Sequence, residues 1–130
     1  TLFATLSGAI ESGLVRACHD CSEGGLGAAL AEMAFAGGWG AEVTLRDLPR
    51  TADLDRSDLA LFSESNSRFI VEVTPEKEAA FRALFAGLPC GHLGEVQAAA
   101  RLKIHGLRDE LLLDEPLDRL KNSWQETLRW

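Results

Sequence analysis

Hydrophobic and polar positions follow two different periods along this chain, one typical of helices and one typical of strands. The stretch 25–36 repeats apolar side chains at Leu26, Leu30 and Met33, which is helical spacing, whereas 69–73 is an almost continuous apolar run. The same pattern predicts helices at 2–12, 25–36, 58–62, 76–85 and 118–128. It predicts strands at 14–19, 39–45, 69–73, 90–96, 102–105 and 111–113.

Glycine and proline set several of these boundaries. Gly13 follows the first predicted helix as a stop signal. Pro75 stands where proline is favoured, at the start of the helix predicted at 76–85. The apolar run 69–73 is expected to be a central strand covered on both faces. The mixture of elements predicts the α/β class: one domain over residues 1–130, an α+β sandwich in which a mixed β-sheet carries helices packed on one face.

Polar residues crowd the junction between the first strand and the second helix. The candidate site there comprises His19, Asp20, Ser22, Glu23, Gly24 and Gly25. Glycines let the backbone adopt positive φ and approach a ligand, and the free N–H groups at a helix start favour an anion such as phosphate. The alternative is that Asp20 or Ser22 simply caps the helix. A cap needs only one such residue, so the crowding favours a ligand site.

A second polar turn precedes the strand 69–73. Its candidate binding residues are Glu64, Ser65, Asn66 and Arg68. Both turns lie at strand ends, so we expect them to converge on one cleft. Arg68 suits a phosphate but equally suits an ion pair with Glu64 or Asp20. His19 is the candidate catalytic residue, as a proton shuttle or by orienting a carboxylate, and the alternative is a structural histidine.

Composition narrows the possible partners. The 130 residues are 46% hydrophobic with a formal net charge of -7, which fits one globular domain and argues against nucleic acid or an anionic membrane surface as partner. A bound phosphate must therefore be held locally or through Mg²⁺. No apolar run approaches the ~20 residues that span a bilayer, and no secretory signal is visible, so a cytoplasmic location is expected. The acidic stretch 46–58 is expected to be a solvated connection.

Two further interpretations concern cysteine and tryptophan. Cys18 and Cys21 form a C-x-x-C pair that Cys90 and His92 could extend to a zinc set, but the spacing is uncommon. We therefore expect no metal site, reduced thiols and a buried Cys18.

Alternatively the chain is an interaction module whose tryptophans pack on another domain. Trp124, on the last predicted helix, is expected to be core, and Trp130 fits either role.

Two motifs carry a family resemblance. The string His19-Asp20-x-Ser22-Glu23-Gly24-Gly25-Leu26 and the later Ser63-Glu64-Ser65-x-x-Arg68 resemble segments of the phosphoribosylformylglycinamidine synthases, in the same order. The closing Leu120-Lys121-x-x-Trp124 also fits the last helix of that family. The likeness extends from about Leu6 to Trp130 and is specific to the carboxy-terminal type of domain in the aminoimidazole-ribonucleotide-synthetase (AIR synthase) superfamily.

The resemblance implies part of an ATP-dependent C–N ligase of purine biosynthesis. Such enzymes convert formylglycinamide ribonucleotide and glutamine-derived ammonia to the amidine. ATP and Mg²⁺ would be bound mainly by an amino-terminal-type domain missing here, and a glutaminase subunit or domain would supply ammonia. The chain, which begins at Thr1, is then expected to be a fragment of a longer protein and inactive alone.

By the same analogy, Glu64 accepts hydrogen bonds from the sugar hydroxyls of the nucleotide substrate. Ser65 forms a hydrogen bond with the phosphate or the amide of that substrate. Two alternatives stay open. Subunits of this family contain two such domains, and the motifs here resemble the second copy, so the site could hold an auxiliary nucleotide or only support the fold. The chain could also belong to another ATP-dependent enzyme of the superfamily, although those enzymes carry different residues in the turn 19–25.

Overall fold

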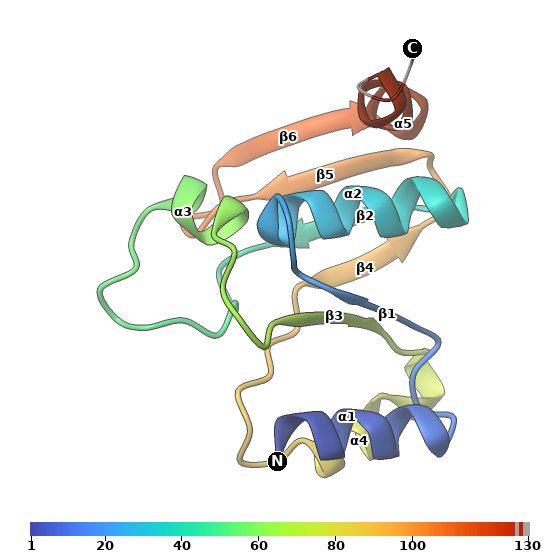
Figure 1. Ribbon diagram of the computed structural model, residues 1–130, viewed down its shortest axis with the longest axis vertical. Coiled ribbons are helices and arrows are strands. Elements are labelled where there is room, and N and C mark those ends of the chain that lie inside the picture. The colour runs from blue at the N-terminus through green and yellow to red at the C-terminus, as the bar shows by residue number, and fades with distance from the viewer. Residues whose placement is uncertain (127, 129–130) are drawn as a thin grey trace.

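The computed structural model describes residues 1–126 and 128 (Figure 1). The helices are α1 (Leu2–Glu11), α2 (Gly25–Gly37), α3 (Ser57–Phe62), α4 (Glu78–Leu84) and α5 (Leu117–Glu126), with a 3₁₀ turn, η1 (Pro75–Lys77), before α4. The strands are β1 (Ala17–Asp20), β2 (Gly40–Thr44), β3 (Phe69–Glu72), β4 (Gly94–Gln97), β5 (Arg101–His105) and β6 (Leu111–Pro116). The predicted α/β class is confirmed.

The strands form two sheets. One is mixed, in the order β4-β2-β5-β6, with β2 and β5 parallel and the other pairs antiparallel. The other is the antiparallel pair β1-β3. The expectation that 69–73 is a central strand is therefore wrong, because β3 pairs only with β1 among the described strands. Its apolar run has another cause: Ile70 packs against one hydrophobic core, and Phe69 and Val71 pack against a second one.

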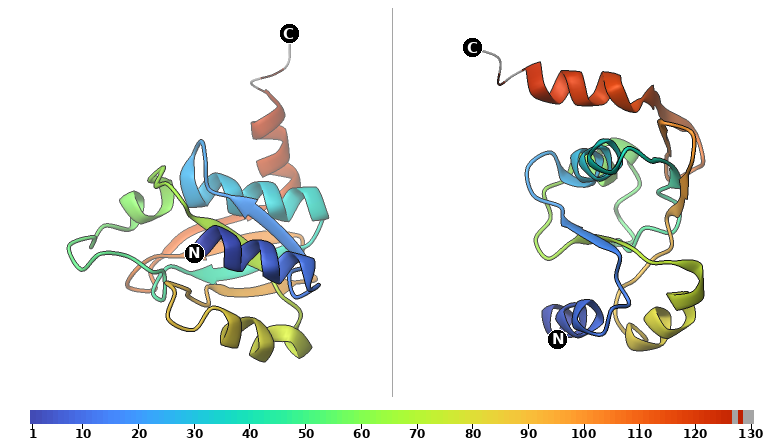
Figure 2. Two further views of the ribbon diagram at one scale, coloured as in Figure 1. Left: turned by 60° about the horizontal axis from the view of Figure 1, so that its bottom comes forward. Right: turned by 90° about the vertical axis from the view of Figure 1, so that its right-hand side faces the viewer.

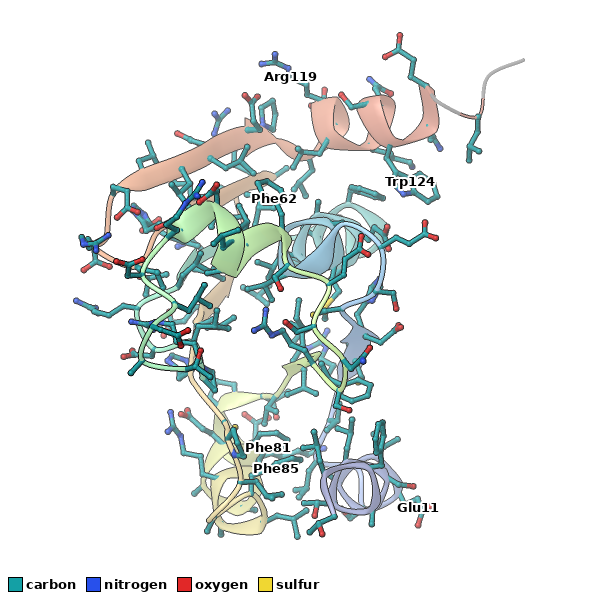
Figure 3. The ribbon with its side chains drawn as sticks, turned by 60° about the vertical axis from the view of Figure 1, so that its left-hand side comes forward. Glu11, Phe62, Phe81, Phe85, Arg119 and Trp124 are labelled. Atoms are coloured by element: carbon teal, nitrogen blue, oxygen red, sulfur yellow. The ribbon has the colours of Figure 1, made fainter. Side chains whose placement is uncertain are left out.

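These two cores lie on either side of the β1-β3 ribbon. The first joins α2 to the four-stranded sheet through residues such as Leu26, Leu30, Leu102 and Ile104. The second joins α1 to α4 beneath the ribbon, and Figure 3 shows Phe81 and Phe85 close together there. In the right-hand view of Figure 2, α2 lies above the ribbon and the two helices of the second core lie below it. The ribbon and the turns at its end therefore lie between the two cores.

The helix α5 lies against α2 near the C-terminus. Trp124 donates its Nε1–H to Glu32 Oε1 over 3.2 Å, and its ring centroid is 5.7 Å from that of Phe35. The Trp124 side chain is still 49% exposed, so the expectation of a core residue is wrong. Trp130 lies outside the described residues. None of the described helices is both long and apolar enough to cross a bilayer.

Candidate functional site

The two polar turns meet at the start of α2. The backbone N–H of Cys21 donates to the carbonyl of Arg68 over 2.9 Å, and the N–H of Gly24 donates to Glu64 Oε1 over 3.0 Å. Neither Asp20 nor Ser22 caps the helix: Gly24 is the N-cap residue, and no side chain of its own turn bonds there. A carboxylate from the second turn therefore satisfies a backbone donor at the start of α2, where the helix dipole also favours a negative charge.

Gly24 and Gly25 make this meeting possible. Their φ angles are 78° and 64°, which is the positive φ that the sequence predicts. A Cβ atom on Gly25 would lie 2.7 Å from the carbonyl carbon of Phe62 and 2.7 Å from the carbonyl oxygen of Ser63. The glycine pair thus lets α2 begin directly against the backbone that leads into the second turn.

An open cavity of about 700 Å³ lies between the two turns. Seven of the predicted site residues line this cavity: Asp20, Ser22, Glu23, Glu64, Ser65, Asn66 and Arg68. The predicted convergence of the turns is therefore confirmed. We call this space the Arg68 cavity. Gly24 and Gly25 do not line it and act through the backbone.

Further lining residues were not among those predicted to bind a nucleotide or substrate. They are Phe3, Cys18, Cys21, Ser67 and Phe69. Alternation along β1 could have indicated Cys18, because residues two apart on a strand face the same side and Asp20 is a predicted site residue. Phe69 pairs with Asp20 across the β1-β3 ladder. Phe3 comes from α1, and no local signal connects it with the turns.

His19 lies on the other side of the ribbon and does not line the cavity. Its Nε2 is 2.7 Å from Glu32 Oε2, and its Nδ1 is 2.5 Å from the carbonyl oxygen of Asp20. Burial opposes the charged imidazole, but the hydrogen bonds to Glu32 and to the Asp20 carbonyl, with both nearby carboxylates, raise its pKa. Both ring nitrogens are therefore engaged by groups of the protein itself.

The charged side chains around the Arg68 cavity differ in the hydrogen bonds and ion pairs that they form. The Ser22 hydroxyl donates to Asp20 Oδ2, and this bond lowers the pKa of Asp20. Within the described part of the chain, the half-buried Arg68 side chain donates one long hydrogen bond, from Nη1 to the carbonyl of Ala60 over 3.5 Å. Among the described residues it forms no ion pair, so the expected alternative of a pair with Asp20 or Glu64 is absent. The cavity therefore offers a guanidinium whose donors remain available to an anionic ligand.

The cysteines do not form the zinc set considered above. Cys18 is exposed, which corrects the expectation of a buried residue, whereas Cys21 is buried. Partial desolvation raises the pKa of both thiols, which favours the neutral thiol in the metal-free chain. Within residues 1–126 and 128, no group of three or more His, Cys, Asp or Glu is arranged to hold a metal ion.

Comparison with known proteins identifies the family to which this chain is similar. Residues 1–106 match the family described as "AIR synthase related protein, C-terminal domain". The chain is 42% identical over 120 residues to a phosphoribosylformylglycinamidine synthase subunit PurL of Deinococcus radiodurans. That alignment covers 92% of this chain but 16% of the relative, so the chain spans less than a fifth of its length.

Solved structures agree with the sequence matches. Thermotoga maritima PurL complexed with ATP superposes with a TM-score of 0.80 at 26% identity, over 92% of this chain and 21% of that chain. A structure of PurLQS from Thermotoga maritima gives a TM-score of 0.80 at 25% identity, over the same shares of both chains. With most of its length matched by the family and its fold shared with these structures, the chain belongs to the AIR synthase related proteins, as a C-terminal domain of that family.

Proposed function

We propose that this chain is the C-terminal AIR-synthase-type domain of a phosphoribosylformylglycinamidine synthase, and that its Arg68 cavity binds the ribonucleotide substrate. One observation carries the proposal: residues from two turns, more than forty positions apart, surround one open cavity that contains Arg68, which forms no ion pair with any residue that the structure describes. The likeness to PurL in sequence and fold supports the same assignment. The cytoplasmic location expected from the sequence belongs to this proposal.

The residues of the cavity have separable roles in this proposal. Arg68 donates to the phosphate of the ribonucleotide, where charge-assisted hydrogen bonds are strongest. Ser65 and Asn66, next to it on the same turn, supply neutral donors to the phosphate or the amide. Glu64 bonds Gly24 through Oε1, and its other oxygen accepts from the sugar hydroxyls. Asp20 and Glu23 on the facing turn add acceptors for the same sugar.

His19 takes a positioning role rather than a catalytic one in this proposal. It holds the carbonyl of Asp20 through Nδ1 and contacts Glu32 of α2 through Nε2. These contacts fix the end of β1 relative to α2, so His19 orients the first turn of the cavity from behind. Because its side chain lies on the opposite face of the strand, it acts on the ligand only through Asp20.

The full reaction requires partners outside this chain. We propose that ATP and Mg²⁺ bind mainly to an amino-terminal-type domain of the same longer protein, since the described residues build no metal site of their own. ATP supplies the phosphoryl group that activates the substrate amide. A glutaminase partner is proposed by analogy with the Thermotoga maritima PurLQS structure. We further propose that the chain covers one domain of this enzyme and is inactive alone.

Isothermal titration tests the substrate assignment. We expect formylglycinamide ribonucleotide to bind, and Arg68→Gln to weaken binding about tenfold or more, because a hydrogen bond to a charged group contributes about 1.5–3 kcal/mol. Arg16→Gln is the matched control, since Arg16 is exposed, pairs with Glu72 and does not line the cavity.

A second titration, with ADP and Mg²⁺, distinguishes the auxiliary-nucleotide alternative. Binding of ADP that Arg68→Gln weakens, without binding of the ribonucleotide, would assign the cavity to an auxiliary nucleotide. Absence of saturable binding of either ligand, both by this chain and by a longer protein that contains it, would refute a ligand site in the Arg68 cavity.

A further inference from the structure

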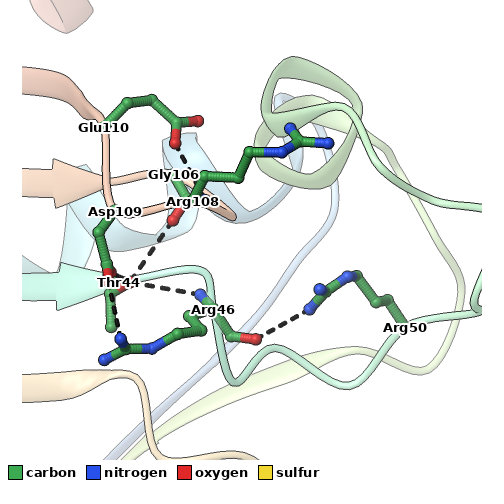
Figure 4. A network of polar contacts seen from close by, with 7 residues as sticks. All are labelled: Thr44, Arg46, Arg50, Gly106, Arg108, Asp109 and Glu110. Carbon is green, nitrogen blue, oxygen red and sulfur yellow. Dashed lines mark hydrogen bonds and ion pairs between the residues drawn. The ribbon is translucent and has the colours of Figure 1, made fainter.

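A second cavity, of about 430 Å³, lies in the long connection that follows β2. Residues 48–52, 54 and 55 line it, together with Leu107 and Arg108 from the turn between β5 and β6. The sequence predicts this connection to be merely solvated, but in the structure it folds around a concave surface. Figure 4 shows the surrounding polar network, with Arg50 and Arg108 reaching out from these two segments. We call this space the Arg50–Arg108 cavity.

Backbone carbonyls hold both guanidinium groups in place. Arg50 donates from Nη1 to the carbonyls of Arg46 and Leu48 over 2.9 and 3.2 Å. Arg108 donates from Nη1 to the carbonyl of Asp55 over 3.1 Å. In the described part of the chain, Nε and Nη2 of both groups make no hydrogen bond within the protein. Each arginine is therefore anchored through one nitrogen while its other donors stay available.

The nearby carboxylates accept hydrogen bonds from groups other than the two guanidiniums. Asp109 accepts from Arg46 Nη1 and from the Thr44 hydroxyl, each over 2.7 Å. Glu110 accepts from the Ser57 hydroxyl and from the backbone N–H of Arg108. The hydrogen bond from Ser57 lowers the pKa of Glu110, and the charge of Arg108 adds to this effect. Asp55 also lines the cavity, but its carboxylate forms no ion pair with either arginine. An ion pair with Asp58 raises the pKa of Arg56, and the charge of Asp55 adds to this effect.

Among the arginines that the structure describes, those without an ion pair all line one of the two cavities. The described arginines that form ion pairs are Arg16, Arg46, Arg56, Arg82, Arg101 and Arg119. The other described arginines, Arg50, Arg68 and Arg108, all line a cavity. Carboxylates are abundant in this chain, which holds 20 Asp and Glu against 13 Lys and Arg. A shortage of acidic partners therefore does not explain why these three guanidinium groups remain unpaired.

We propose that the Arg50–Arg108 cavity binds a small organic phosphate, a phosphate monoester. Its phosphate accepts from the available donors of Arg50 and Arg108, whose planar groups match phosphate oxygens. Its apolar part packs on Leu54, a half-buried leucine of the lining, whereas Leu48 and Leu107 of the same lining are buried. The volume falls in the range of small-molecule sites, about 300–1,000 Å³. This site is separate from the Arg68 cavity, so neither proposal depends on the other.

Titrations of the isotopically labelled chain followed by NMR test this site. The probes are inorganic phosphate and phenyl phosphate at pH 7.5 and constant ionic strength. We expect saturable shifts at the backbone amides of 48 and 50–55 and at the Nε–H groups of Arg50 and Arg108. Phenyl phosphate should bind about threefold or more tightly than inorganic phosphate, because its ring covers the half-buried Leu54. Equal affinity for the two probes would overturn the organic part of the proposal.

Variants assign the effect to the two arginines. Arg50→Gln with Arg108→Gln should weaken binding about tenfold or more, whereas the charge-matched control Arg16→Gln with Arg82→Gln should leave it unchanged. Arg68→Gln should also leave it unchanged, which separates this site from the Arg68 cavity. If the double glutamine variant unfolds, Arg50→Lys with Arg108→Lys keeps the charges and should weaken binding about threefold. Non-saturating shifts, or unchanged affinity in the arginine variants, would overturn the proposal.

Discussion

At the residue scale, Gly25 meets two requirements that together exclude other side chains. Its φ of 64° is left-handed, and its missing Cβ leaves room for the Phe62 and Ser63 backbone. A side chain there would incur backbone strain and would also push α2 away from the second turn. The junction of the two turns therefore depends on this single position.

We expect Gly25→Ala to lower the free energy of unfolding by about 2–4 kcal/mol, since left-handed strain and a steric clash add. Gly37→Ala is the matched control at the other end of α2, where the added Cβ meets nothing within 4 Å. That control should be neutral or stabilising by up to about 1 kcal/mol, because alanine favours helix more than glycine does. Urea denaturation measures both changes. Equal midpoints for the two variants would contradict the proposed close approach.

At the element scale, β1 directs its side chains to two different places. Cys18 and Asp20 point toward the Arg68 cavity, whereas His19 points to Glu32 on α2, as strand alternation requires. Glu32 also accepts from Trp124, so one carboxylate joins β1, α2 and α5. Part of the stability of this contact therefore depends on whether His19 is protonated.

The free energy of unfolding should therefore depend on pH through His19. The pKa of His19 is raised in the folded protein, so its ion pair with Glu32 stabilises fully below the unfolded pKa near 6.5. The stabilisation declines as the pH rises through the folded pKa. Glu32→Gln, which keeps an oxygen acceptor for Trp124, should therefore cost about 1 kcal/mol at pH 6 and less at pH 8.5.

Urea denaturation of wild type and Glu32→Gln from pH 5.5 to 8.5 measures the effect. Glu95→Gln serves as control because Glu95 is an exposed residue of β4 that forms no ion pair with described residues. Its stability curve should run parallel to that of wild type. A constant difference between Glu32→Gln and wild type across the range would show that the His19 charge contributes nothing.

At the scale of the whole molecule, two hydrophobic cores support the β1-β3 ribbon from opposite sides (Figure 2). The second core is the smaller, and its centre is the stacked pair Phe81 and Phe85, whose ring centroids are 4.5 Å apart. Because the ribbon carries one wall of the Arg68 cavity, the second core stabilises the site from beneath without contributing a ligand group.

Phe81→Ala should lower the free energy of unfolding by about 3–5 kcal/mol, since it leaves a void in a packed aromatic pair. Leu84→Ala on the same helix is the control, because Leu84 is 44% exposed, and it should cost less than about 1 kcal/mol. Denaturation measures both variants, and amide hydrogen exchange should show that α1 and α4 lose protection first. If Phe81→Ala lowered the free energy of unfolding no more than Leu84→Ala does, a structural role for the second core would be contradicted.

Features controlled by local chemistry are predictable from the amino-acid sequence alone. The helix predicted at 25–36 is α2 (Gly25–Gly37), Pro75 begins a helical turn, and Gly24 and Gly25 adopt positive φ. Each of these follows from side-chain spacing or from backbone sterics within a few residues. The polar residues of the candidate site were equally visible, because they cluster within two short turns.

Which of these elements meet depends on the tertiary structure. It separated β3 from the larger sheet, because its two faces serve different cores. It shortened the strand predicted at 90–96 to β4, because the segment before Gly94 lies against the connection after β2, where a Cβ on Gly91 would lie 2.0 Å from the carbonyl oxygen of Asp47. It also turned His19 away from the Arg68 cavity and placed Arg50 and Arg108 in the lining of one other cavity. These outcomes depend on contacts between residues far apart in the chain, which spacing along the sequence does not encode.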